Sequence, residues 1–258
     1  MTATDPPATT SGTGMSPLRK HSLTAGILYL ITFISIPTLG LYGPVKGAGF
    51  IISSAAATGA LWGGVLEVIV ALAGIGTAVA LFPVVKRQNE SLALGFVATR
   101  TLEAAMIFAG VASILSLVAL QHPGASGAEA TSLTTAGGAL VALYNGVFLL
   151  GQSLMPPANA LLLGTLMYRS GLVPRAIPLI GLIGAPLQIA AVLLTMFGVV
   201  DPLSPVRVIL VLPVFIWELS LGVYLTVKGF KPAPIITDLI APAAAPPPAR
   251  DPVTAPGG

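Results

Sequence analysis

The stretch GFVATRTLEAAMIFAG, residues 95–110, has the apolar character of a membrane-spanning helix but carries Arg100 and Glu103 one helical turn apart. It belongs to an apolar block, residues 92–120, that exceeds the about 20 residues an α-helix needs to cross the hydrocarbon core of a bilayer. The block therefore predicts a transmembrane helix. The two charges inside it are the feature that any account of function has to explain.

The rest of the chain has the same apolar character. Of its 258 residues, 55% are hydrophobic and only 8% are charged, whereas soluble domains have about 25% charged residues. Six blocks reach spanning length, at residues 23–42, 61–85, 92–120, 139–167, 176–200 and 206–227. None alternates in polarity as a strand of a membrane barrel would. We therefore predict an all-α integral membrane protein, a bundle of six transmembrane helices.

Lys and Arg are divided unevenly between the two sides of the predicted bundle. One side carries Arg19, Lys20, Lys86, Arg87, Arg169, Arg175, Lys228 and Lys231, and the other carries only Lys46 and Arg207. Because cytoplasmic loops collect Lys and Arg, we expect both termini in the cytoplasm and the protein in the cell membrane. Cations at span ends meet the anionic headgroups of the lipid bilayer, so the net charge of +3 requires no nucleic-acid partner.

The two ends of the chain differ in composition from the blocks. Residues 1–19 and 231–258 are rich in Pro, Ala, Gly and Thr and hold few large apolar side chains, so we expect both tails to be disordered. Residues 20–230 then form one six-helix transmembrane domain. Between the spans, we expect the apolar patch at 50–52 to cover the end of the bundle and residues 121–138 to form a polar loop.

The residue sets that catalysis inside a membrane needs are missing. The sequence has no Cys, its two histidines, His21 and His122, stand at span ends, and its four aspartates lie in tails or a loop. This excludes a buried Ser–His dyad, a bis-His haem site, a His-based zinc site and a paired-aspartate protease. We therefore expect no enzyme activity, no catalytic residue, no cofactor and no metal site.

Four ionisable side chains remain inside the apolar blocks, namely Glu67, Arg100, Glu103 and Glu218. Each costs at least about 2.5 to 3.5 kcal/mol in hydrocarbon, so such residues usually face the bundle interior and pair, or mark an ion or substrate path. Arg100 lies about 12 Å inside if its span begins near residue 92, but about 3 Å inside, within reach of the headgroups, if it begins near residue 98. Glu67, about 9 Å from the outer end of its span, is close enough for its side chain to reach the outer interface, whereas Glu218 is not.

Charge balance favours pairing among these residues. Glu103 follows Arg100 by three residues and lies on the same helical face. Arg100 is also the only basic residue between the span ends, and an unpaired buried carboxylate is costly. We therefore expect Arg100 to compensate Glu103, Glu218 or both, and we prefer this structural role to a role in transport.

Three amides and several prolines add packing information. Asn145, Gln152 and Asn159 recur every seven residues, which places them along one stripe of the fourth helix. We expect interhelical hydrogen bonds, worth about 0.6 to 2 kcal/mol each, rather than a solute path. Kinks or helix ends are predicted at prolines within the spans, namely Pro37, Pro83, Pro156, Pro157, Pro178, Pro186 and Pro213.

Three segments together carry a family resemblance. They are ATRTLEAA (98–105), LLLGTLMYRSGLVPRAIPLIGLIGAP (161–186) and WELSLGVYLTVKGF (217–230), and in this order they resemble the DUF4386 family of small multi-pass membrane proteins over about residues 20–230. By that resemblance the matching positions are Arg100, Glu103, Arg169, Pro174, Arg175, Glu218 and Gly222. The family name denotes unknown function, so the resemblance implies an architecture and no activity.

Two functional hypotheses stay open. In the first, the protein is a transporter-like bundle for a small solute or ion, with Glu103 and Glu218 near a site at mid-depth. Six spans could form two inverted halves of three, although the halves show no persuasive sequence similarity. In the second, it is a non-enzymatic scaffold or signalling partner whose basic loops bind lipid or another protein. A water-accessible cavity at the two acids favours the first, and a dry, sealed ion pair favours the second; the sequence indicates neither solute, protein partner nor oligomeric state.

Overall fold

The computed structural model describes residues 15–237, and this part of the chain is built from helices without a strand. The long helices are α1 (Pro17–Thr32), α2 (Ser35–Tyr42), α3 (Thr58–Val85), α4 (Glu90–Ala119), α5 (Gly127–Phe148), α6 (Met155–Ser170), α7 (Ala176–Met196) and α8 (Pro205–Val227). Short helical turns are η1 (Pro44–Lys46), η2 (Phe50–Ile52), η3 (Leu149–Leu154) and η4 (Pro234–Ile236). Helices α1 and α2 together form the first span, and α5, η3 and α6 the fourth, which gives six spans that are long and apolar enough to cross a membrane. The predicted all-α, six-span fold is confirmed.

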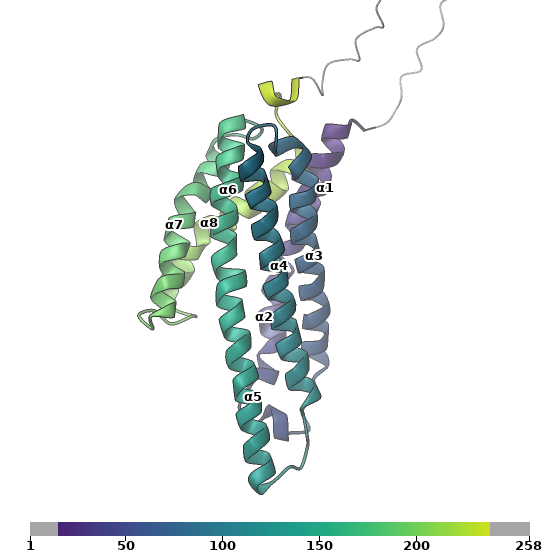
Figure 1. Cartoon of the computed structure of the whole chain (residues 1–258), viewed down its shortest axis with the longest axis vertical. Coiled ribbons are helices and arrows are strands. Elements are labelled where there is room, and N and C mark those ends of the chain that lie inside the picture. Colours follow the sequence, from purple (N-terminus) through teal and green to yellow (C-terminus); the bar gives the residue numbers. More distant parts are fainter. Residues whose placement is uncertain (1–14, 238–258) are drawn as a thin grey trace, which may run out of the picture.

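The six spans run side by side (Figure 1), and their contacts arrange them as a ring in chain order. Helix α1 packs on α3, α3 on α4, α4 on α5 and α6, α6 on α7, and α7 on α8, which closes the ring against α1. Viewed from the basic end, all six spans follow one another around this ring in the same direction, clockwise or anticlockwise. A two-fold axis in the membrane plane would make the last three spans follow one another in the direction opposite to the first three. Two inverted repeats of three spans would need such an axis. The chain-order ring is therefore not an inverted-repeat architecture.

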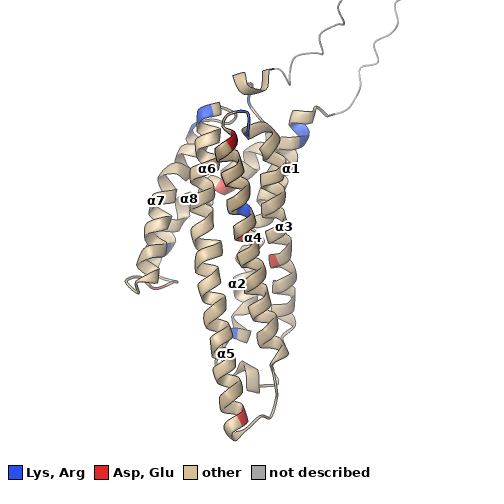
Figure 2. Cartoon of the chain, in the orientation of Figure 1, with Lys and Arg blue, Asp and Glu red and all other residues tan. Residues whose placement is uncertain are grey.

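One end of the bundle carries most of the Lys and Arg (Figure 2), and we refer to it as the basic end. Its residues are Arg19, Lys20, Lys86, Arg87, Arg169, Arg175, Lys228 and Lys231. Measured from this end, α7 and α8 are about 31 and 34 Å long, whereas α3 and α4 are about 42 and 45 Å long. Figure 1 shows α7 and α8 stopping well short of the far end of α5.

The turn between α7 and α8 carries exposed apolar side chains. Phe197 is 81% exposed and Leu203 is 93% exposed. Apolar side chains exposed in this way are stable in contact with lipid. The length of α7 and α8 matches a hydrocarbon core of about 30 Å. The far ends of α3, α4 and α5 extend past this turn (Figure 1), and we refer to them as the projecting end.

The projecting end has a small apolar core of its own. Phe50 and Ile51 are buried there against Tyr42, Leu117 and Tyr144. The amide of His122 also donates to the carbonyl of Ile51 at 2.7 Å, which ties the two connecting segments together. The apolar patch at 50–52 thus covers the end of the bundle, as expected.

Residues 121–138 were expected to form a polar loop, and this expectation is wrong for most of the segment. Helix α5 already begins at Gly127. The hydroxyls of Thr131, Ser132, Thr134 and Thr135 donate to carbonyls four residues earlier, so the polar side chains are satisfied within the helix. This polar start of α5 belongs to the projecting end (Figure 1).

Described structure continues on both sides of residues 20–230. Helix α1 begins at Pro17, where the Ser16 hydroxyl caps it by accepting from the amide of Arg19 at 3.3 Å. At the other end, the amide of Lys231 donates to the carbonyl of Leu172 at 2.8 Å, and Ile236 is buried in the main core. The rest of the two tails, for which disorder was expected, lies outside the described residues.

Candidate functional site

Arg100 is held deep inside the bundle. It lies ten residues after the start of α4, about 15 Å along the helix axis from the basic end. Because α4 begins before residue 92, the longer of the two distances along the helix applies, and the side chain of Arg100 is only 3% exposed. The rings of Tyr29 and Phe96 lie 5.1 and 5.8 Å from its guanidinium carbon, within the range of cation–π attraction. Its Nε is buried without a hydrogen-bond partner.

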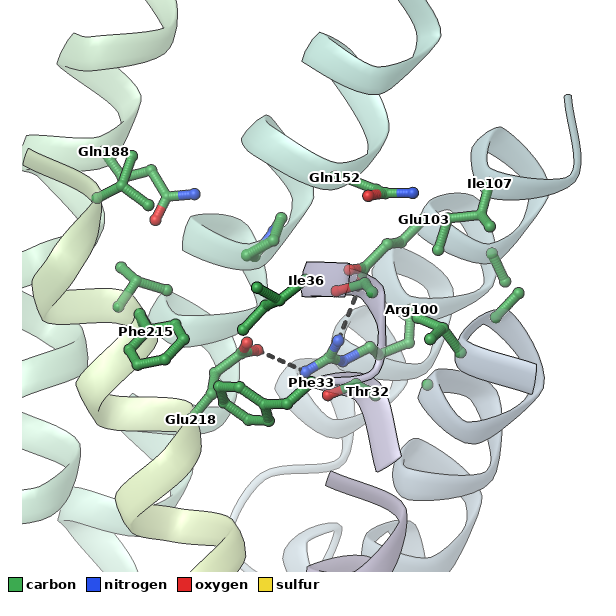
Figure 3. Close-up of a pocket in the computed structure, with 18 residues that line it drawn as sticks. Thr32, Phe33, Ile36, Arg100, Glu103, Ile107, Gln152, Gln188, Phe215 and Glu218 are labelled. Atoms are coloured by element: carbon green, nitrogen blue, oxygen red, sulfur yellow. Dashed lines mark hydrogen bonds and ion pairs between the residues drawn. The ribbon is translucent and has the colours of Figure 1, made fainter. Parts of the chain in front are cut away.

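The guanidinium pairs with both expected acids (Figure 3). Its Nη1 lies 3.0 Å from Oε2 of Glu103, and its Nη2 lies 2.7 Å from Oε1 of Glu218. Glu218 precedes the end of α8 by nine residues, which is about 14 Å from the basic end and so matches the depth of Arg100. Helices α4 and α8 are not neighbours in the ring, so this ion pair connects opposite sides of the bundle interior.

The amides of the fourth span all make hydrogen bonds to other spans or connecting segments, as predicted. Asn159 donates to Oε2 of Glu103 at 2.8 Å, and its own oxygen accepts from the hydroxyl of Thr99 at 2.5 Å. Gln152 donates to Oε2 of Glu67. Asn145, near the projecting end, accepts from Nζ of Lys46 at 3.3 Å. Partial burial in η1 lowers the pKa of Lys46.

Glu67 does not reach the outer interface, so that expectation is wrong. It is 2% exposed and lies 18 residues before the end of α3, about 27 Å from the basic end. The sequence estimate failed because α2 packs over this part of α3 and covers the acid. The hydroxyl of Thr38 lies 2.5 Å from Oε1, and Gln152 occupies Oε2. Within residues 15–237, no Lys or Arg forms an ion pair with this acid.

A further polar group was missed by sequence reasoning. Gln188 of α7 is buried, and its Nε2 donates to the carbonyl of Ser153 at 2.8 Å. The hydroxyl of Ser153 in turn accepts from Nη2 of Arg207 at 2.9 Å. The sequence did contain a signal, because Gln188 and Thr195 are the only side chains with hydrogen-bonding groups in the 21 residues of α7.

The charged side chains face a cavity of about 170 Å³ in the middle of the ring. All six spans contribute to its lining. The polar part of the lining includes Arg100, Glu103 and Glu218 together with the two amides Gln152 and Gln188. Figure 3 shows these side chains turned toward a common space between the helices.

Two spans are interrupted where they line this cavity. In the first span, α1 ends at Thr32 and α2 begins at Ser35. In the fourth, the π-helical turn η3 precedes Pro156 and Pro157, which have no amide hydrogen to continue the helix. The interrupted helices leave room that straight helices would fill. Interruptions at the middle of the membrane are typical of transporter binding sites.

The basic loop residues identified by resemblance lie apart from the cavity. Arg169 is in the last turn of α6, and Pro174 and Arg175 precede α7, all at the basic end. Arg169 and Arg175 are exposed, and the guanidinium of Arg175 lies 5.5 Å from the ring of Tyr168. These residues can meet a membrane surface or a partner but cannot contact a ligand in the cavity.

The charged side chains inside the ring lie within a region that matches a known family. The family described as "Domain of unknown function (DUF4386)" matches residues 24–229. The chain belongs to the DUF4386 family. This DUF4386 region covers all six spans, including Arg100, Glu103 and Glu218. No match was found among curated proteins or among solved structures.

Proposed function

We propose that this DUF4386 protein is a transporter-like bundle that binds a small solute or ion in its central cavity. The observation that carries the proposal is that both acids of the buried ion-pair network open onto the cavity. The side chains of Glu103 and Glu218 retain 12% and 15% exposure inside the ring, while Arg100 between them retains 3%. A volume of about 170 Å³ holds several water molecules or one small solute, since a water occupies about 30 Å³ in the liquid.

The energetic cost of these charges supports the same proposal. An ionised side chain in the middle of a membrane span costs at least about 2.5 to 3.5 kcal/mol, and replacing a buried ion pair by apolar residues is often neutral or stabilising. A bundle that served only as a scaffold would gain little from Arg100, Glu103 and Glu218. A bundle that binds a polar solute needs polar groups at this depth.

We also propose that both termini are cytoplasmic and that the protein resides in the cell membrane. The basic end carries most of the Lys and Arg, and within the described residues the far end carries only Lys46 and Arg207. Reporter fusions at His122 and Gly171 should then report the exterior and the cytoplasm, respectively. Two reporters on the same side would contradict this orientation.

The alternative proposal is a non-enzymatic scaffold or signalling partner. It is favoured by the exposed Arg169 and Arg175 at the basic end, which suit anionic headgroups or an acidic protein surface. In that case the cavity would have no role, and substitutions that line it would affect stability alone. Neither proposal includes an enzymatic step, a cofactor or a metal.

The test is a flux screen with the purified protein in proteoliposomes at controlled pH and membrane potential. We expect flux of at least one class of small solute or ion, and we expect Glu218→Gln to reduce it roughly tenfold or more, because a charged hydrogen bond is lost at the site. Glu129→Gln is the matched control, since Glu129 is 62% exposed at the projecting end. Absence of flux for every solute would favour the scaffold. Flux that is equal in parent and Glu218→Gln protein would show transport that does not use this cavity site.

A further inference from the structure

The charge that lines the cavity is unbalanced. Arg100 contributes one positive charge, and Glu103 and Glu218 contribute two negative charges, so the lining carries a net charge of −1 when all three are ionised. These three are the only charged residues that line the cavity in the described part of the chain. In a medium of low dielectric constant, one uncompensated negative charge attracts a monovalent cation.

The hydrogen-bonding groups around the cavity are also unbalanced, with an excess of acceptors. Arg100 and Asn159 both donate to Oε2 of Glu103, and Arg100 donates to Oε1 of Glu218. The other oxygen of each carboxylate has no donor among residues 15–237. Two carboxylate oxygens are therefore available to a ligand that donates hydrogen bonds.

The glutamine amides present oxygen rather than nitrogen. Nε2 of Gln188 donates to the carbonyl of Ser153 at 2.8 Å, and because a carbonyl can only accept, the orientation of the amide is fixed. Its Oε1 is buried and has no hydrogen-bond partner, although the side chain is 3% exposed. Buried acceptors are normally satisfied, so this oxygen adds to the excess of acceptors around the cavity. Nε2 of Gln152 is likewise used by Glu67, which leaves its oxygen free for the cavity.

The opposite wall of the cavity is aromatic and aliphatic. The rings of Phe33 and Phe215 meet edge to face with their centroids 5.1 Å apart, and both lie beside Glu218 (Figure 3). Ile36 and Val211 extend this wall. Aromatic faces attract ammonium groups, and aliphatic side chains accommodate an alkyl chain.

We propose that the cavity binds a small organic ammonium ion, a protonated amine with a short alkyl chain. The ammonium group donates to the free oxygens of Glu103 and Glu218, and the alkyl chain lies on the wall formed by Phe33 and Phe215. A bare metal ion would leave most of the volume unfilled, and the described residues contain no group of three His, Cys, Asp or Glu side chains that could hold one. This inference specifies the substrate class and rests on the binding site of the proposed function.

The test compares four probes of similar size or charge on purified protein in detergent at neutral pH. A ligand that binds the folded state raises the midpoint of thermal unfolding in a dose-dependent way. We expect this rise with propylammonium chloride, but not with sodium chloride at equal ionic strength, sodium propionate or 1-propanol. An equal rise of the unfolding midpoint with sodium chloride would assign the site to an inorganic cation. An equal rise with propionate or propanol would show that the site does not recognise the positive charge of the ligand. Each result would overturn the proposal.

Variants locate the site. Equilibrium binding of radiolabelled propylammonium should weaken roughly tenfold or more in Glu103→Gln and in Glu218→Gln, because each removes a negative charge from the cavity, and should not change in Glu129→Gln. Unchanged affinity in both cavity variants would place the amine elsewhere and contradict the proposal.

The flux and binding results separate this inference from the proposed function. If propylammonium binds and no solute is transported, the substrate class stands and the transport role fails. If another solute is transported in a Glu218-dependent way while propylammonium does not bind, the substrate class fails and the transport role stands. If there is neither flux nor binding, both fail.

Discussion

Two acidic sites lie inside this bundle at depths that differ by about 12 Å along the helix axes, and they are stabilised in different ways. Near the basic end, Glu103 and Glu218 share the guanidinium of Arg100. Further out, Glu67 has only the hydroxyl of Thr38 and the amide of Gln152. The comparison shows that a buried acid can be held by an opposite charge or by neutral donors. The two arrangements predict different responses to substitution.

The largest effect is expected for Arg100→Leu. It leaves two carboxylates in the interior without their cation, and removing one partner of a buried pair typically costs about 3 to 5 kcal/mol. The measurement is thermal unfolding of the purified variant and the parent in the same detergent at neutral pH. A variant as stable as the parent would show that the ion pairs contribute nothing to the fold.

Partial rescue by a second substitution should identify the more dependent acid. Glu103 keeps the donor Asn159 after Arg100 is lost, whereas Glu218 has no other donor among the described residues. Glu218→Gln should therefore restore more of the stability of Arg100→Leu than Glu103→Gln does. The measurement is the unfolding midpoint of the parent, of Arg100→Leu and of the two double variants. A larger rescue by Glu103→Gln would show that Glu103 depends on Arg100 more than Glu218 does.

A smaller loss is expected for Asn159→Leu. This change removes one donor to Glu103 and one acceptor for Thr99, and interhelical hydrogen bonds in membranes are worth about 0.6 to 2 kcal/mol each. Unfolding in the same detergent measures the loss. The control is Asn145→Leu at the projecting end, where the bond to Lys46 is exposed and should matter less. Equal losses would show that burial at the central site adds no strength to these hydrogen bonds.

The smallest effect is expected for Glu67→Gln. The hydroxyl of Thr38 has one hydrogen but lies 2.5 Å from two acceptors, the carbonyl of Ser35 and Oε1 of Glu67. An amide at position 67 can donate to Thr38 and accept from Gln152, so stability should stay within about 0.5 kcal/mol of the parent or rise. Glu103→Gln in the Arg100 site is the matched comparison. A loss of several kcal/mol at position 67 would mean that its charge is needed.

Much of the fold could be predicted from the sequence because hydrocarbon imposes simple requirements on a chain. Length and apolarity identified six spans, and the balance of charges identified Glu103 and Glu218 as partners of Arg100. The pairing of Arg100 with Glu218 could have been predicted more firmly, because counting residues from the basic end of each helix places both side chains at nearly the same level.

The features that the sequence did not reveal depend on how long each helix is and on where helices break. Glu67 was given access to the interface because the sequence does not show that α2 packs over α3 and covers this acid. Residues 127–138 were assigned to a loop because their polarity obscures the helix that begins at Gly127. The cavity itself depends on the break between Thr32 and Ser35 and on the π-helical turn before Pro156, which are tertiary outcomes that apolar periodicity does not encode.

The central claim is that the Arg100 site opens onto a cavity that water and small cations can enter. The chain has no cysteine, so a single Ser35→Cys substitution places one thiol in the lining, and Ser22→Cys places one in a fully buried position of α1 as the control. The measurement is the rate at which the thiol forms a mixed disulfide with 2-aminoethyl methanethiosulfonate, which is cationic, or with its anionic 2-sulfonatoethyl counterpart, each releasing methanesulfinate. We expect Ser35→Cys to react with the cationic reagent roughly tenfold or more faster than with the anionic one, because the cavity carries negative charge. We expect Ser22→Cys to react with neither reagent, because a thiol needs water to ionise. A Ser35→Cys thiol that reacts with neither reagent would mean that the ion pairs are sealed from water, and it would contradict the claim.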